Sequence, residues 1–204
     1  TTSVLGYFGA EVIKVEPPKG GDPLRVWRAL GDDGTSFWWR AMSRNKKSVT
    51  LDLRTDEGRA IAKQLALKAD VLVENFLPGR MEEWGLGPEA LKNENPKLVY
   101  ARVSGYGQTG PYASKPGYAS VCEGFGGFRY VNGFPDRPSV RPNLSLGDTL
   151  ASLHAVIGIL LALVERGKVD GVGQVVDVAI YEAVFDVLES VVPEFDGAGI
   201  VREP

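Results

Sequence analysis

The sequence contains almost no thiol and almost no imidazole. Its 204 residues include one cysteine, Cys122, and one histidine, His154. A single thiol excludes a disulfide framework and a thiolate zinc cluster, and a single imidazole excludes metal sites built from two or three histidines. We therefore expect no bound metal and a reducing compartment. That compartment is the cytoplasm, with the mitochondrial matrix as the alternative in a eukaryote.

Neither the net charge nor the length of the apolar stretches indicates a nucleic-acid or membrane partner. The net charge of −3 gives no basic field that would attract nucleic acid or an anionic bilayer. The longest apolar stretch, near 150–164, contains His154 and is shorter than the roughly 20 residues that a membrane helix needs. We therefore expect no nucleic-acid partner and no membrane.

The two ends of the sequence lack the features of a complete chain. The start, TTSVLGYFGAEV, has no methionine and no cleavage pattern, and it enters a helix-to-strand unit almost at once. The end, GAGIVREP, has the composition of a loop. We expect the chain to be part of a longer protein.

The spacing of apolar residues alternates between every second position and every third or fourth position. This pattern predicts strands at 11–16, 48–53, 71–76, 97–105 and 173–180, and helices at 55–70, 88–93, 148–166 and 182–192. Strands that alternate with helices predict the α/β class, with a parallel sheet flanked by helices.

A glycine-rich segment, GYGQTG at 105–110, has the spacing of a dinucleotide-binding motif. Its context does not fit, because Pro111 and Pro116 follow and no helix opens there, whereas the phosphate of such a motif rests on a helix N-terminus. We expect a glycine-rich substrate loop, with a plain surface loop as the alternative.

One acid stands at the start of an apolar helix, in the stretch RPNLSLGDTLASLHAVIGILLALVERG. Asp148 follows Gly147, and no other charged residue occurs before Glu165, so we expect a buried helix. An aspartate there can cap the helix, which contributes about 1 kcal/mol. Beside a glycine that permits close approach, it is also a candidate covalent nucleophile, although the residues alone favour the cap. Both functions stay open.

Other polar residues have simpler interpretations. His154 lies on the apolar side of the same helix, and we expect a core histidine satisfied by hydrogen bonds. A basic group can hold phosphates or can be exposed surface charge, and these alternatives stay open. It consists of Arg25, Arg44, Lys46, Lys47 and Arg54.

Six blocks, in this order, carry a resemblance to a known family. They are GAEVIKVEPPKGGDPLR, SRNKKSVTLDLRTDEGR, ADVLVENFLPGRMEEWGLG, NPKLVYARVSGYGQTGPYASKPGY, SLGDTLASLHAVIGILLAL and GVGQVVDVAIYEAV. Together they resemble the class III CoA-transferases, the family of formyl-CoA transferase and carnitine CoA-transferase, from about residue 6 to about residue 190.

The resemblance implies a Rossmann-like large domain. Residues 1–190 would be the N-terminal part of this CoA-binding domain, and 191–204 would begin the linker to a small domain that the sequence lacks. The family's N-terminal strand is absent too, and together these segments make up roughly half of a usual chain. Members form homodimers of two interlaced ring-like subunits.

The resemblance also implies a covalent mechanism, because Asp148 matches the family's catalytic aspartate. That aspartate attacks an acyl-CoA thioester to give a mixed anhydride and free CoA. CoA then forms an aspartyl-CoA thioester, which the acceptor carboxylate attacks. Acyl-CoA and a small carboxylic acid would thus be the substrates, and no cofactor would be permanently bound.

Matching positions identify the residues expected around CoA. Arg25 matches a phosphate-binding arginine, and Leu51 with Arg54 matches a pair that lies by the adenine and binds a phosphate. Asn75, Phe76 and Gly79 belong to a turn that runs past CoA, and Tyr118 matches a tyrosine near the active site. Two positions depart from the family: Glu83 stands where an arginine is common, and Ala119 stands where an acid is usual.

Three functional hypotheses remain. A transferase of the subgroup that uses succinyl-CoA and small dicarboxylates is favoured. Arg129, Arg137 and Arg141 are candidates to meet a second carboxylate, with exposed loop arginines as the equal alternative. An α-methylacyl-CoA racemase is disfavoured, because the racemase histidine falls at Tyr118. A truncated CoA-binding fragment without catalysis is the third hypothesis.

Overall fold

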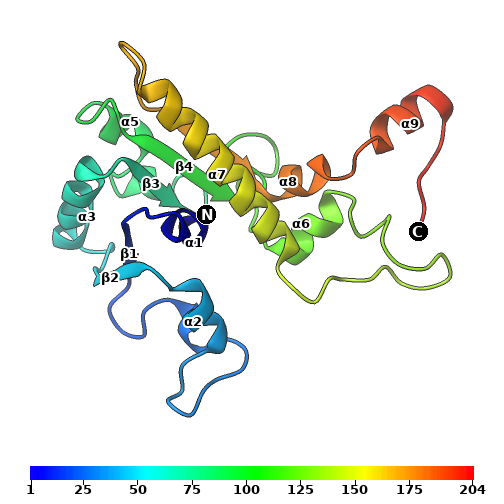
Figure 1. Cartoon of the computed structure of the whole chain (residues 1–204), viewed down its shortest axis with the longest axis horizontal. Coiled ribbons are helices and arrows are strands. Elements are labelled where there is room, and N and C mark those ends of the chain that lie inside the picture. The colour runs from blue at the N-terminus through cyan, green and yellow to red at the C-terminus, as the bar shows by residue number, and fades with distance from the viewer.

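The computed structural model describes all 204 residues and contains two parallel sheets. Strands β1 (Val12–Glu16) and β2 (Lys46–Thr50) form one sheet, and the other has the order β3-β4-β5 (Figure 1). Its strands are β3 (Val71–Glu74), β4 (Val99–Ser104) and β5 (Val175–Ala179). The α/β class is confirmed, although the strands form two sheets instead of one.

Helices fill most of the intervals between the strands. They are α1 (Thr2–Tyr7), the 3-10 helix η1 (Pro23–Val26), α2 (Phe37–Met42), α3 (Asp56–Lys68), α4 (Arg80–Glu83), α5 (Pro88–Lys92), α6 (Ala119–Phe125), α7 (Leu146–Arg166), α8 (Ile180–Asp186) and α9 (Val191–Ala198). The single helix expected at 182–192 is instead α8 and α9, and α9 stands away from the sheets (Figure 1).

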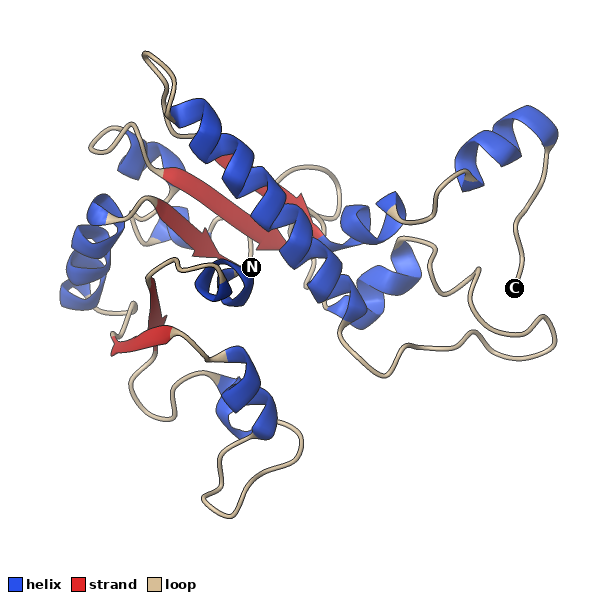
Figure 2. Ribbon diagram, viewed as in Figure 1, coloured by secondary structure: helices blue, strands red, loops and turns tan.

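Helix α7 crosses one face of the three-stranded sheet (Figure 2). Small residues allow the close contact: a Cβ on Gly158 would lie 2.6 Å from a Val176 methyl carbon. Ile159 and Ala162 pack with Val99 and Ala101 of β4 in one buried cluster. Strand β4 is the central strand and is almost entirely buried, as expected for a parallel strand covered on both faces.

The other face of α7 is exposed and apolar, so the expectation of a fully buried helix is wrong. This face carries Leu153, Ile157, Leu160, Leu161 and Val164. By length and composition α7 is also the one helix able to cross a membrane. The core helix of a globular protein passes the same test, and the buried face of α7 contacts β4 and β5.

The carboxyl ends of β3, β4 and β5 point toward the region where α7 begins (Figure 2). The glycine-rich segment follows β4 as a loop over 105–118, and no helix opens in GYGQTG, as expected. Its two ends meet, because a Cβ built on Gly105 would lie 2.4 Å from the Cα of Gly117. Ligands of parallel α/β sheets bind outside the carboxyl ends of the strands, so this edge is where a site is expected.

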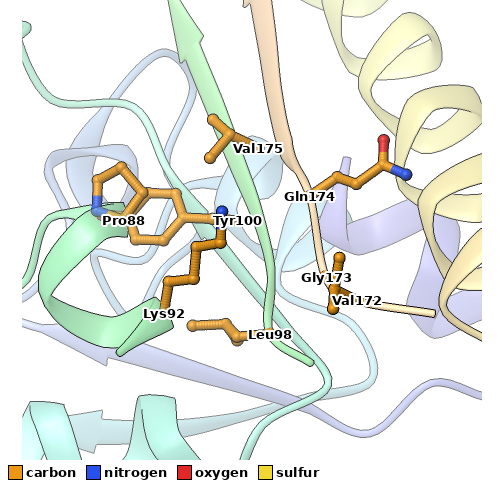
Figure 3. Close-up of a pocket in the computed structure, with 8 residues that line it drawn as sticks. All are labelled: Pro88, Lys92, Leu98, Tyr100, Val172, Gly173, Gln174 and Val175. Atoms are coloured by element: carbon orange, nitrogen blue, oxygen red, sulfur yellow. The ribbon is translucent and has the colours of Figure 1, made fainter. Parts of the chain in front are cut away.

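A cavity of about 290 Å³ lies near the opposite, amino-terminal ends of β4 and β5 (Figure 3). Its lining is Pro88, Lys92, Leu98, Tyr100, Val172, Gly173, Gln174 and Val175. Lys92 supplies its only ionisable group apart from the Tyr100 hydroxyl, which donates to the Leu86 carbonyl at 2.9 Å. This cavity is therefore a poor candidate for chemistry.

Candidate active site

Asp148 is the third residue of α7 and keeps a solvent-accessible side chain. No side chain caps α7, which begins after Ser145, so of the two functions left open for Asp148 the structure does not support helix capping. The first turn of a helix attracts negative charge. The environment nevertheless raises the pKa of Asp148, first because the surrounding protein partly shields it from water and second because the Glu123 carboxylate is nearby. The Asp148 carboxylate makes no hydrogen bond or ion pair within the chain.

Gly147 allows three helices to meet beside Asp148. A Cβ at this position would lie 2.9 Å from a methyl carbon of Ile180 and 3.3 Å from the backbone of Ala119. Those residues open α8 and α6. The close approach expected of this glycine is confirmed, and it brings the start of α6 against the start of α7.

Helix α6 places a buried acid under this junction. Glu123 is fully buried, and its Oε1 accepts a hydrogen bond of 3.2 Å from the backbone N–H of Gly147. Its Oε2 lies 3.7 Å from Nη2 of Arg129, which also donates to the Ser120 hydroxyl. Sequence reasoning missed Glu123, although the only acid in an otherwise apolar helix, ASVCEGF, was a visible signal.

Tyr118 and Cys122 occupy the same part of the molecule. Tyr118 immediately precedes α6 and is 69% exposed, so its ring is open to a ligand. Cys122 is fully buried, and its Sγ lies 3.4 Å from the carbonyl oxygen of Gly105. Burial, together with the charges of Asp148 and Glu123, raises the pKa of the Cys122 thiol to about 11, so it is an unreactive thiol.

A second group of expected residues gathers at the carboxyl end of the β1–β2 sheet. Glu16, which ends β1, accepts hydrogen bonds from Nε and Nη2 of Arg25 at 2.8 and 3.0 Å. The Arg25 guanidinium also lies 4.1 Å from the ring centroid of Trp39. Leu51 donates its N–H to the Glu16 carbonyl at 2.9 Å. Arg54 is exposed and pairs with Asp52 at 2.7 Å.

The Glu16–Arg25 pair makes stability depend on acid pH. Hydrogen bonding to Arg25 is the largest cause that lowers the pKa of Glu16 to about 2. A carboxylate with a depressed folded-state pKa stabilises the fold above its unfolded pKa of about 4.3, and this contribution is lost as pH falls toward 2. Urea unfolding should therefore show Glu16→Gln less stable than the wild type at pH 6, with a difference that shrinks at pH 3. A constant difference would contradict the assignment.

The third group forms the turn after β3. Phe76 donates its N–H to Oε2 of Glu74 at 2.7 Å, and its ring meets Trp84 edge to face at 5.1 Å. Asn75 is exposed, and Gly79 has φ +89° at the start of α4, a backbone conformation that glycine adopts without strain. In the same turn region, Glu83 pairs with Arg80 at 2.7 Å.

A buried ion pair at the end of β3 supports this turn. Nε of Arg102 in β4 lies 2.7 Å from Oε1 of Glu74, and both side chains are buried. The guanidinium also contacts Glu82 of α4 at 2.6 Å. Arg102 thus ties the end of β3, through Glu74, to the helix that follows the turn.

The expected site residues therefore form three groups. Asp148 and Tyr118 lie at the starts of α7 and α6, which pack together. Arg25 and Leu51 bond to Glu16, and Arg54 pairs with Asp52 in the segment that follows β2. Asn75, Phe76 and Gly79 share one turn. The side chains of different groups make no hydrogen bond or ion pair with one another. Ser104, whose buried hydroxyl has no partner at the end of β4, is a further polar group that sequence reasoning missed.

His154 is bonded as expected but is not in the core. Its Nδ1 lies 2.9 Å from the Leu150 carbonyl oxygen, its Nε2 lies 3.1 Å from Oδ2 of Asp186, and its side chain is about one-third exposed. Six residues separate it from Asp148, about 9 Å along a helix and on another face. The two side chains are not arranged as an acid–base pair.

The chain belongs to CoA-transferase family III, whose model matches residues 1–204. It is 52% identical over 98% of its length to the succinyl-CoA–D-citramalate CoA-transferase of Chloroflexus aurantiacus, and covers 50% of that protein. It is 48% identical over 98% of its length to the succinyl-CoA–L-malate CoA-transferase alpha subunit of the same species, covering 47% of that subunit. The chain thus spans about half the length of these relatives.

A solved structure confirms the fold. A CAIB/BAIF family protein from Brucella suis superposes with a TM-score of 0.92 and 36% sequence identity. The match covers 98% of this chain and 54% of that protein. The resemblance predicted from the six sequence blocks is therefore confirmed.

Proposed function

We propose that this chain is the catalytic half of a CoA-transferase that moves CoA from succinyl-CoA to a small dicarboxylic acid through a covalent intermediate on Asp148. The observation that carries the proposal is the position of Asp148. Its carboxylate is accessible, has no hydrogen-bond or ion-pair partner, and lies in the first turn of α7 near the carboxyl ends of a parallel sheet. A free acid in this place suits a nucleophile.

The proposed chemistry balances without a cofactor. An oxygen of Asp148 attacks the thioester carbon, a C–O bond forms, the C–S bond breaks, and an anhydride and CoA thiolate result. The thiolate attacks the aspartyl carbonyl, which releases succinate and leaves an aspartyl-CoA thioester. The acceptor carboxylate attacks this thioester, and the thiolate then attacks the acceptor carbonyl of the new anhydride, which yields the product thioester and restores Asp148.

We propose that CoA binds along the other two groups. Arg25 and Arg54 would meet phosphates, with Leu51 beside the adenine, and the turn of Asn75, Phe76 and Gly79 would flank the remaining chain. The resting pairs with Glu16 and Asp52 are compatible with this assignment, because they hold both guanidinium groups in defined positions. Tyr118 would border the acyl group beside Asp148.

The relatives support the substrate class. The names of two of them specify succinyl-CoA as donor and D-citramalate or L-malate as acceptor, both dicarboxylates. Arg129 is the best-placed of the candidate arginines, because it approaches Glu123, whose carboxylate bonds to Gly147 beside Asp148. From the family resemblance we also propose that the whole protein is a homodimer.

A trapping experiment tests the covalent step. The protein is incubated with succinyl-CoA, half the sample is treated with hydroxylamine, and peptides are mapped by mass spectrometry. We expect an acyl or CoA adduct on the Asp148 peptide that hydroxylamine removes and that Asp148→Asn lacks. CoA binding without an adduct would support a non-catalytic fragment or a racemase, and the racemase predicts loss of an α-deuterium from a 2-methylacyl-CoA.

A further inference from the structure

Glu123 is the most unusual polar side chain near Asp148. It is 0% exposed, yet its carboxylate makes one hydrogen bond, from the N–H of Gly147. Its Oε2 is buried without a hydrogen-bond partner, because Arg129 approaches it only to 3.7 Å. Nε of Arg129 is buried without a partner as well.

This arrangement lowers the free energy of unfolding, so a contribution to stability does not explain it. Removing a carboxylate from water costs several kcal/mol unless it is paired and hydrogen-bonded, and here one oxygen lacks a hydrogen bond. A neutral glutamine at this position can also accept from Gly147, through its amide oxygen. The hydrogen bond therefore explains why an acceptor is present, but it does not explain why the acceptor carries a negative charge.

We propose that Glu123 is a positioning residue for Asp148. Through its hydrogen bond with Gly147, Glu123 holds the first turn of α7, and its negative charge favours the acylated form of Asp148 over the free carboxylate. This inference rests on the proposed function. Glu123 would not touch the substrate and would act only through Asp148.

The electrostatic part follows from the charge balance of the first step. Free Asp148 is an anion near the anion Glu123, and like charges in a partly desolvated site repel. When Asp148 becomes an anhydride, its charge passes to the CoA thiolate and the repulsion at α7 disappears. The raised pKa of Asp148, to which Glu123 contributes after burial, has the direction that this repulsion requires.

Few other titratable groups lie on the helices packed against α7, and of their acids only Glu123 contributes to the raised pKa of Asp148. On α6 these are Cys122 and Glu123. On α8, Glu182 accepts from the Tyr181 hydroxyl at 3.1 Å and Asp186 pairs with His154. Arg129 faces Glu123 and offsets part of its charge. Glu182→Gln is therefore a matched control, since it removes one acid from a helix packed against α7.

The test measures Asp148 directly and does not need turnover. The protein with ¹³C-labelled aspartate is titrated by NMR, and Asp148→Asn assigns the Asp148 carboxyl signal. In Glu123→Gln we expect the pKa of Asp148 to fall by about one unit, while the Gly147 amide keeps its protection from hydrogen exchange. In Glu182→Gln both should stay as in the wild type. An unchanged Asp148 pKa in Glu123→Gln overturns the electrostatic role.

Two further measurements separate this inference from the proposed function. Glu123→Ala, with its fold checked by circular dichroism, should lose Gly147 protection, and retained protection overturns the positioning role. The rate of adduct formation with succinyl-CoA should fall in Glu123→Gln, because a less basic carboxylate is a weaker nucleophile. If the wild type forms no adduct, the proposed function fails, and the titration still decides the role of Glu123.

Discussion

Asp148→Asn is expected to stop the exchange of labelled succinate into succinyl-CoA, with a fall in rate of at least about a thousandfold. This exchange needs only the donor half of the proposed reaction, because succinate released from the enzyme can attack the aspartyl-CoA thioester in reverse. An asparagine amide is nearly the same size as the carboxylate but has no anionic oxygen to attack the thioester carbon. Mass spectrometry of succinyl-CoA measures the incorporated label.

The matched control for this experiment is Asp170→Asn. Asp170 lies in the turn between α7 and β5 with φ +62°, a conformation that asparagine also tolerates. The Asp170→Asn substitution removes one negative charge, as Asp148→Asn does, and we expect it to leave the exchange at the wild-type rate. Exchange that persists in Asp148→Asn would show that another group carries the acyl transfer.

Arg102→Met is expected to lower the free energy of unfolding by about 3–5 kcal/mol. The methionine fills much of the space of the arginine but leaves the Glu74 carboxylate buried, without its partner at 2.7 Å. The contact with Glu82 is lost too, so the turn that holds Phe76 is no longer tied to α4. Urea denaturation followed by tryptophan fluorescence measures the change.

Two variants identify the cause. Adding Glu74→Gln to Arg102→Met removes the stranded charge, and we expect part of the lost stability to return. Arg80→Met breaks an exposed pair with Glu83, which should change stability by less than about 1 kcal/mol. If the double variant is no more stable than Arg102→Met, lost packing around β4, and not an unpaired carboxylate, dominates the effect.

The strands and long helices were predictable because their apolar spacing is strong and local. Strand β4 is apolar along most of its length, and α3 carries an N-cap at Thr55 and acids in its first turn. The shorter helices α2, α4 and α6 escaped prediction, since about one to two turns give too little periodicity. The break after Asp186 was missed too, because Glu189 adopts φ +57° without a glycine or proline to mark it.

The candidate site was predictable only in part. Asp148 stands out in the sequence, but its surroundings depend on α6, which packs beside it through the contact of Ala119 with Gly147. The roles of Glu123 and Arg102 depend on their partners Gly147 and Glu74, which lie 24 and 28 residues away in sequence. Single-sequence patterns do not register such distant pairs. The exposed face of α7 was missed for the same reason, since an apolar helix gives no sign of which side is covered.

The loop that follows β4 is closed at its base and anchored along its first half. Gly105 and Gly117 touch through their backbones, and the buried Tyr106 packs against Phe125 of α6 and Tyr181 of α8. The Gln108 N–H also donates to Oδ2 of Asp177 in β5. Sequence changes in the first half of the loop therefore disturb the packing of α6 and α8, whereas changes at the exposed residues 114–116 can leave Ser104 and Tyr118 in place.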